Sequence, residues 1–227
     1  PSTAYRTQIR GYRGDNTPDN KPKGAMIYYS LNSPKDSVTL TILDEARKEV
    51  RTFSSAKEDD ELSAEAGLQS FVWDLKYPEP DLIESAVMSL SYTGGVTAVP
   101  GMYTIKLTAD GEGMEQIVEL KADPRWESTT QDLQAQFDLG VAVRDTLTAV
   151  HDLIRTIRSV RTQVKEIARR SEKAEYHVKL GSDCQELSDK LTALEEKLIQ
   201  TRSESSQDPI NYPVKLDNQY SYLYTVV

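Results

Sequence analysis

The sequence of 227 residues has one cysteine, two histidines and no long apolar run. A single cysteine, Cys184, excludes any disulfide within the chain. No stretch of about 18 apolar residues occurs, so we predict no membrane span. The histidines, His151 and His177, have no His or Cys neighbours at the spacing of a metal site. We therefore predict neither a zinc site nor a cofactor.

The sequence also has no excess of basic residues. Its formal net charge is −9, and a protein that neutralises phosphates needs a basic surface, so nucleic acid is not a predicted partner. With 38% hydrophobic and 28% charged residues, the composition is that of a globular protein. The length allows two domains.

Sequence signatures of catalysis are scarce. The Gly94-Gly95 pair is typical of a turn, and no glycine-rich phosphate loop or nucleophile elbow occurs. A carboxylate pair for glycoside hydrolysis, Asp74 with Asp44 or Glu79, is the strongest enzymatic alternative. Any acidic protein offers such pairs, however, so this chain is not predicted to be an enzyme.

The richest apolar pattern lies in 67–78, GLQSFVWDLKYP. Phe71, Trp73, Leu75 and Tyr77 occupy alternate positions, which place four large side chains on one face of a strand. Burying each is worth about 1.5–3 kcal/mol, so this segment should organise the core of the first half.

Further strand patterns surround this segment, with turn residues between them. Six or seven short strands predict an antiparallel β-sandwich of immunoglobulin type over 20–123, after an N-terminal lead-in over 1–19. An acidic loop over 54–66 is expected to be solvated. The other predicted strands are 25–31, 37–43, 49–53, 99–109 and 115–121.

The spacing of the apolar residues changes after Asp123-Pro124-Arg125. Apolar residues then recur every three or four positions from Leu133 to Ala168 without a proline, which predicts one helix of about 40 residues. Ser128 and Gln131 have the spacing of a capping box at its start. A second helix is predicted after Gly181, capped by Ser182. Its apolar seam consists of Cys184, Leu187, Leu191, Leu194, Leu198 and Thr201.

So narrow a seam needs a partner helix, so 124–227 is predicted to form a long antiparallel helical hairpin. A third helix should begin at Leu216. A helix of one heptad is not stable in isolation, so it should pack on the hairpin. We also expect further helical sequence beyond Val227. Because the chain begins at Pro1, we expect it to be a fragment. The predicted fold class is α+β: a sandwich followed by an incomplete helical bundle.

Two groups of residues are candidates for interaction. Arg155, Arg158, Lys165 and Arg169 make one flank of the long helix basic, which suits an anionic glycan. The structural alternative is pairing with acidic residues of the second helix such as Glu195. Aromatic rings in the last segment suit stacking on sugars, although packing beside Leu216 and Leu223 is the simpler interpretation. The tyrosines singled out are Tyr220 and Tyr224.

The β part carries a resemblance. The segments TLTILDEARKEVRTF, AGLQSFVWDLKYP and VPGMYTIKLTADG, over about 35–121, resemble the immunoglobulin-like domain of flagellar hook-capping proteins. Those domains often have glycine after Trp-Asp, where this chain has Leu75. We therefore expect the turn to come later, at Pro78.

A second resemblance covers about 10–227. The segments ADPRWESTTQDLQAQF and QDPINYPVKLDNQYSYL are similar to the C-terminal region of bacterial sortilin-like β-propeller proteins, often labelled BNR-repeat glycosyl hydrolases. The propeller itself would lie N-terminal and is not in this sequence. The resemblance implies an exported protein, and its hydrolase label belongs to the propeller.

Three functions are thus predicted, in order. The first is a non-catalytic structural region that braces the propeller of the same polypeptide and presents a rigid helical arm to a protein partner. The second is a carbohydrate-binding module serving a hydrolase, with a glycan as partner. The third, an intrinsic glycosidase, is the least favoured.

Overall fold

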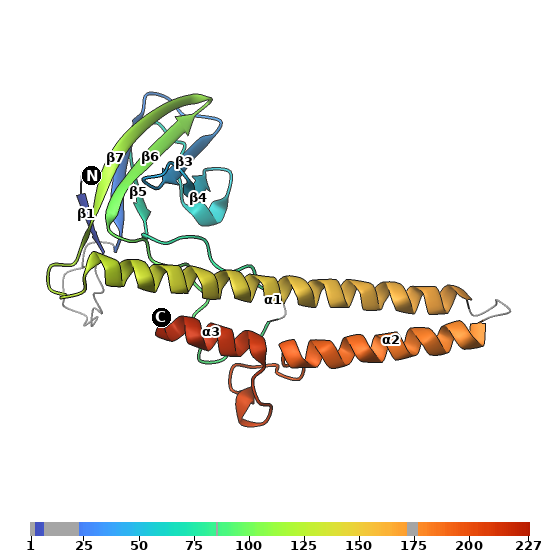
Figure 1. The fold of residues 1–227 in the computed structure, drawn as a ribbon. Coiled ribbons are helices and arrows are strands. Elements are labelled where there is room, and N and C mark those ends of the chain that lie inside the picture. Colours follow the sequence, from blue (N-terminus) through green and yellow to red (C-terminus); the bar gives the residue numbers. More distant parts are fainter. Residues whose placement is uncertain (1–2, 7–22, 85, 172–176) are drawn as a thin grey trace. The chain divides into compact units, whose positions relative to one another are not determined.

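A computed structural model of the chain describes residues 3–6, 23–84, 86–171 and 177–227. Strands form the first part of the chain and helices the second, as Figure 1 shows, so the predicted α+β class is confirmed. The strands are β1 (Thr3–Arg6), β2 (Ala25–Leu31), β3 (Val38–Leu43), β4 (Glu49–Ser54), β5 (Gly67–Trp73), β6 (Gly101–Ala109) and β7 (Glu112–Ala122).

These strands form two sheets. Five of them have the order β1-β7-β6-β3-β4, and β2 pairs with β5 in the second sheet. The hairpins β3–β4 and β6–β7 are antiparallel, as predicted. The prediction of a purely antiparallel sheet after a lead-in is wrong for Thr3–Arg6, because these residues pair with β7 in parallel and Ala4 is buried. The remainder of the predicted lead-in, 7–19, lies outside the described residues.

The two sheets share one apolar core, with Trp73 fully buried in it. The Trp73 ring packs edge-on against Tyr103, with 5.2 Å between ring centroids, and Phe71 packs against Phe53 at 4.6 Å. The alternation predicted for this strand is therefore confirmed at Phe71 and Trp73. The predicted solvated loop contributes Leu62 to the same core, so that loop is only partly solvated.

The strand ends earlier than predicted. Leu75 has a φ of 62°, which is the left-handed conformation that favours glycine. The Asp74 carboxylate accepts a hydrogen bond from the Lys76 N–H at 3.1 Å and so fixes the turn. The expectation of a turn only at Pro78 is wrong, because burial of the Leu75 side chain offsets the cost of its backbone.

The predicted long helix is present as α1 (Thr130–Ser171), 42 residues in length. Its capping box is displaced by one residue from the prediction. The Thr129 hydroxyl accepts from the Asp132 N–H at 3.1 Å, and the Asp132 carboxylate accepts from the Thr129 N–H at 2.9 Å. The prediction of Ser128 with Gln131 is therefore wrong, because Asp132 bonds back more strongly than an amide would.

The second helix begins before its predicted cap. In α2 (His177–Leu198), Gly181 and Ser182 lie inside the helix, so the prediction that they end a loop and start the helix is wrong. The Cβ of an alanine at position 181 would meet no atom within 4 Å, so neither packing nor turn geometry requires the glycine. A single 3-10 turn, Asp208–Ile210, precedes α3 (Leu216–Val226), which begins where predicted.

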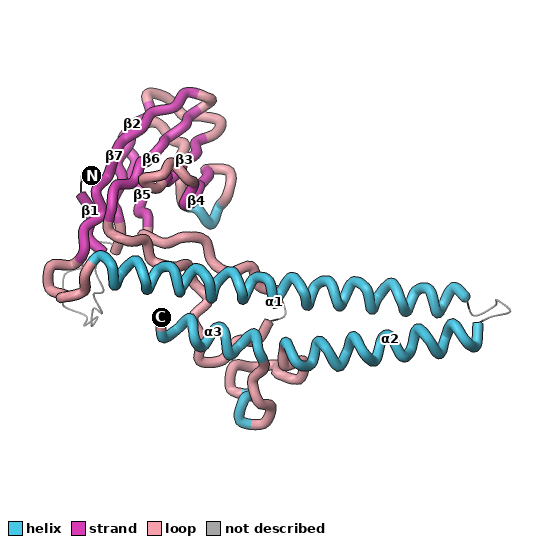
Figure 2. Tube along the Cα trace, in the orientation of Figure 1, coloured by secondary structure: helices cyan, strands magenta, loops and turns pink. Residues whose placement is uncertain are grey.

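The chain folds into two compact units that are not consecutive in the sequence. One contains Pro1–Pro78 and Gly95–Asp138, and the other contains Glu79–Gly94 and Leu139–Val227. The sequence predicts a single boundary after 123. The difference arises because 79–94, drawn as loop in Figure 2, packs its buried Ile83 with residues of α1 and α2.

The ends of this inserted segment are held together within the first unit. The Tyr77 N–H donates to the Val96 carbonyl at 2.9 Å, and the Ala98 N–H donates to the Leu75 carbonyl at 2.7 Å. Gly95 directly precedes Val96 at this crossing, where a Cβ would come within 1.8 Å of the Tyr77 carbonyl oxygen. Only glycine allows the two chain segments to approach so closely.

Candidate functional site

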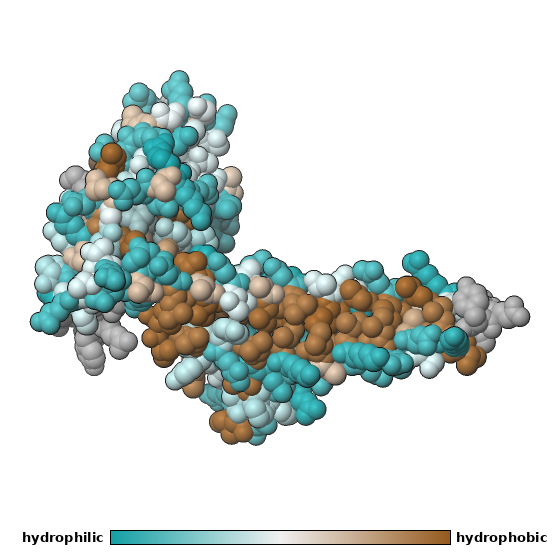
Figure 3. Space-filling model, viewed as in Figure 1, coloured by the Kyte–Doolittle hydropathy of each residue, from teal (hydrophilic) through white to brown (hydrophobic). Residues whose placement is uncertain are grey.

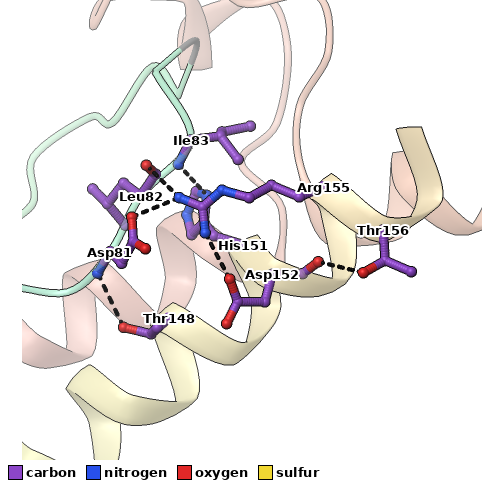
Figure 4. A network of polar contacts seen from close by, with 8 residues as sticks. All are labelled: Asp81, Leu82, Ile83, Thr148, His151, Asp152, Arg155 and Thr156. Carbon is purple, nitrogen blue, oxygen red and sulfur yellow. Dashed lines mark hydrogen bonds and ion pairs between the residues drawn. The ribbon is translucent and has the colours of Figure 1, made fainter. Parts of the chain in front are cut away.

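The basic flank predicted on the long helix is engaged inside the helical unit, starting with Arg155. Its guanidinium donates to the Asp81 carboxylate at 2.6 Å, to the Leu82 carbonyl at 2.8 Å and to the Asp152 carboxylate at 2.6 Å (Figure 4). The first two bonds join α1 to the inserted segment, and the third stays within α1 and holds the guanidinium in place. Arg155, a candidate residue for binding an anionic glycan, thus anchors 79–94 to the helix.

His151 lies beneath this contact and is fully buried. Its Nδ1 accepts a hydrogen bond from the Ile83 N–H at 3.2 Å, while the Asp81 N–H donates to the Thr148 hydroxyl at 3.1 Å (Figure 4). Burial, with a smaller effect from the Arg155 charge, lowers the pKa of His151 to about 4. The imidazole is therefore neutral at pH 7, as its role as an acceptor requires.

Arg158 and Arg161 take the structural alternative that the sequence offers. Arg158 Nε donates to Glu195 of α2 at 2.6 Å, and Arg161 donates to the other oxygen of Glu195 at 2.5 Å. Glu195 is 2% exposed, so two cations compensate one buried carboxylate. The predicted pairing of the basic flank with α2 is confirmed at this residue.

The other two basic candidates lie farther along α1. Lys165 is exposed, and Arg169 is exposed with its guanidinium 3.0 Å from the Glu166 carboxylate one turn earlier. The contact of Arg169 with Glu166 is separate from those of Arg155, which contacts residues 81 and 82. The structure therefore does not bring the four predicted basic residues together at one site.

The tyrosine candidates lie on α3. Tyr224 is buried and its ring packs against Tyr92 with 5.3 Å between centroids, which confirms the packing interpretation for this residue. Burial raises the pKa of Tyr224. Its hydroxyl has no hydrogen-bond partner among the described residues. Tyr220 is half-buried on the same helix.

The residue that fixes α3 is Asn218, which the sequence analysis did not single out. Its amide donates to the Ser89 carbonyl at 2.9 Å and accepts from the Ser89 N–H at 2.7 Å, so it pairs with one backbone position of the inserted segment. Thr225 and Ser221 make similar bonds to the backbone of Tyr92. A polar face on an otherwise apolar helix was the available signal.

An apolar face of the helical unit remains exposed. Leu139, Leu153 and Ile167 of α1 recur at multiples of seven residues, and Leu187 and Leu194 of α2 do so too. Each of these side chains is 44–50% exposed. Figure 3 shows the face as a brown stripe that runs over both helices. Leu187 and Leu194 belong to the apolar seam predicted for the second helix. The side of α2 that contacts α1 buries Ser188 and Glu195 instead.

The carboxylates considered for glycoside hydrolysis have structural contacts. Asp74 fixes the turn after β5 and lies 3.7 Å from Arg51, and Asp44 accepts from the Lys48 N–H at 2.8 Å. Within the described ranges, no group of three or more His, Cys, Asp or Glu side chains could hold a metal ion. In the same ranges, no helix has the length and apolar character to cross a membrane.

Comparison with known proteins assigns no family. No family model and no curated protein matches the chain. One solved structure that it resembles is CopC from Methylosinus trichosporium OB3b, at 15% identity and a TM-score of 0.25, covering 48% of this chain and 82% of that one.

Proposed function

We propose that this chain is a non-catalytic interaction region whose helical unit binds another polypeptide through its apolar face. The observation that carries the proposal is the line of half-exposed side chains Leu139, Leu153, Ile167, Leu187 and Leu194. Soluble monomers seldom expose a long contiguous apolar patch that has no binding role. Covering the exposed half of each side chain is worth about 1 kcal/mol.

The spacing of this face indicates the chemistry of its partner. Positions that repeat every seven residues on two neighbouring helices form a groove that suits a further amphipathic helix. The charged and aromatic residues favoured from sequence are a poorer basis for binding, since Arg155, Arg158 and Tyr224 contact residues of the same unit. A carbohydrate-binding role therefore has less support than a protein-binding role.

The wider context of the proposal comes from the sequence. We propose that the chain adjoins a sortilin-like β-propeller in an exported protein and that its β part is immunoglobulin-like. The Asp-Pro-Arg motif that supports this resemblance forms a compact turn, in which Asp123 accepts from Arg125. The Arg125 guanidinium lowers the pKa of Asp123 to about 2, so the pair stays charged and the turn stays closed.

The proposal can be tested with a photoreactive amino acid placed at Leu187 or Leu194 and activated in cells that produce the protein. We expect a covalent adduct with a polypeptide from either position. The matched control carries the same amino acid at Ile117, which is 55% exposed on β7 and should give no adduct. Absence of adducts from both leucines would contradict the proposed function.

A further inference from the structure

The apolar face lies on one side of the α1–α2 hairpin, and the other side is already occupied. On α1, the positions of His151 and Arg155 face the inserted segment, to which both side chains are bonded. Leu153 lies about 200° around the helix from both, at 100° per residue. At His151 and Arg155 the inserted segment therefore covers one side of α1, and the apolar face, which Figure 3 shows as a stripe, lies on the opposite side of the helix.

The register between the two helices is fixed by four side chains. Arg158 bonds to Glu195, and Arg161, three residues on, bonds to Thr192, three residues back. Continued along both helices, this register sets Ile167 level with Leu187 to within one residue. Arg170 and Asp183 share a level on the same register. Ile167 and Leu187 therefore form one apolar layer across the two helices, whereas Leu139 and Leu153 lie beyond the end of α2.

The two outer edges of the apolar face differ in charge. Asp138, Asp145, Asp152 and Glu166 recur at multiples of seven on the outer side of α1, followed by Arg170. On α2 the corresponding edge carries Asp183, Lys190 and Lys197. On this register Glu166 and Arg170 lie near the levels of Lys190 and Asp183, so acidic then basic on α1 is matched there by basic then acidic on α2. Asp138, Asp145 and Asp152 lie beyond the end of α2.

This pattern is complementary to itself. We propose that the apolar face binds the same face of a second copy of the chain, with the two hairpins related by a two-fold axis parallel to the helices. The inference depends on the proposed function, because it names the partner of that face. The resulting four-helix layer would place α1 of each copy beside α2 of the other.

The charges select this axis over its alternative. A two-fold axis parallel to the helices keeps levels unchanged, so Arg170 lies level with the partner's Asp183, and Glu166 lies about 4.5 Å along the axis from the level of the partner's Lys190. An axis perpendicular to the helices would instead set the acidic edge of α1 against itself. Like charges across such an interface oppose association.

The first experiment measures association of the full chain by sedimentation velocity. We expect a dimer, and we expect Leu187→Asp with Leu194→Asp to raise the dissociation constant at least about 100-fold. The control is Ile210→Asp, because Ile210 is 88% exposed outside the face. Circular dichroism should show that all variants keep their helix content. A monomeric wild-type chain at about 100 μM would overturn the inference.

The second experiment tests the arrangement with substitutions that leave the face intact. Arg170→Asp or Asp183→Arg alone should weaken the dimer about 10-fold, and the double exchange should restore it to within about 3-fold. Gln163 and Lys190 lie at the same level on opposite edges. In a Cys184→Ser background, chains with Gln163→Cys and chains with Lys190→Cys should therefore form a mixed disulfide.

These outcomes separate the inference from the proposed function. Adducts of the photoreactive chains with twice the chain's mass, together with the mixed disulfide, support both. Adducts with a different protein, from a chain that sediments as a monomer, would overturn self-association and leave the interaction role standing. Disulfides that form only between two Gln163→Cys chains would indicate the perpendicular axis and overturn the proposed arrangement.

Discussion

Among single residues, the buried polar groups show most clearly how the helical unit is held together. His151, Asn218 and Glu195 are each at most 5% exposed, and each bonds to a different partner: the inserted segment's backbone at Ile83, its backbone at Ser89, and two arginines of α1. A buried polar side chain is tolerated where it has such partners. The sequence patterns that predict helices do not reveal them, because each partner is far away along the chain.

The depressed pKa of His151 makes stability dependent on pH. The folded protein keeps the imidazole neutral down to about pH 4, whereas an unfolded histidine binds a proton near pH 6.5. The unfolded state therefore binds more protons between these values, so the stability that the neutral imidazole contributes is complete above pH 6.5 and is lost as the pH falls toward 4. The loss should be on the order of 3 kcal/mol.

The measurement compares wild type with His151→Asn by urea unfolding from pH 4 to 8. Asparagine can still accept from the Ile83 N–H but does not titrate, so the wild-type advantage should shrink as the pH falls. Asp217→Asn supplies a control of opposite sign, because burial raises the pKa of Asp217 to about 6. The free energy of unfolding of wild type should rise relative to that of Asp217→Asn as the pH falls from 6 to 3.8. A pH-independent difference for His151→Asn would contradict the assignment.

Among the elements, the crossing at Gly95 decides where the inserted segment leaves and returns. Its geometry leaves no space for a side chain, since a Cβ would lie 1.8 Å from the Tyr77 carbonyl oxygen. Relieving that overlap must separate the backbone bonds that join 75–77 to 96–98. The closure of the inserted segment thus depends on Gly95, which the sequence pattern predicts only as part of a turn.

We expect Gly95→Ala to lower the free energy of unfolding by roughly 2–4 kcal/mol. Gly101→Ala is the matched control, because a Cβ at Gly101 meets no atom within 4 Å and should change stability by less than about 0.5 kcal/mol. Chemical unfolding of both variants gives the comparison. Equal stability of the two would mean that the backbone at Tyr77 can move without cost.

For the whole molecule, local patterns predict the elements well and the division of the chain poorly. Alternation over 67–73 and the three-four period of α1 each depend on neighbouring residues, so both appear in the sequence. The packing of 79–94 with α1 and α2, which begin at Thr130 and His177, is not visible in the sequence, where this segment reads only as an irregular stretch. The sequence also does not show which side of α2 contacts α1. The contact buries the charged Glu195 and leaves the apolar Leu194 exposed, the reverse of what hydrophobicity predicts.

The last prediction tests that division by hydrogen exchange. Ile154 is fully buried against Ile83 and Ile199, so Ile154→Ala should cost about 2–5 kcal/mol, all within the helical unit. We expect faster amide exchange in 79–94 and α2, with unchanged exchange in β5 and β6. Ile42→Ala, fully buried among the strands, should have the converse effect. If Ile42→Ala instead speeds exchange in 79–94 together with β5 and β6, this segment belongs to the sheet unit, as its place in the sequence would suggest. Amides of one cooperative unit open together.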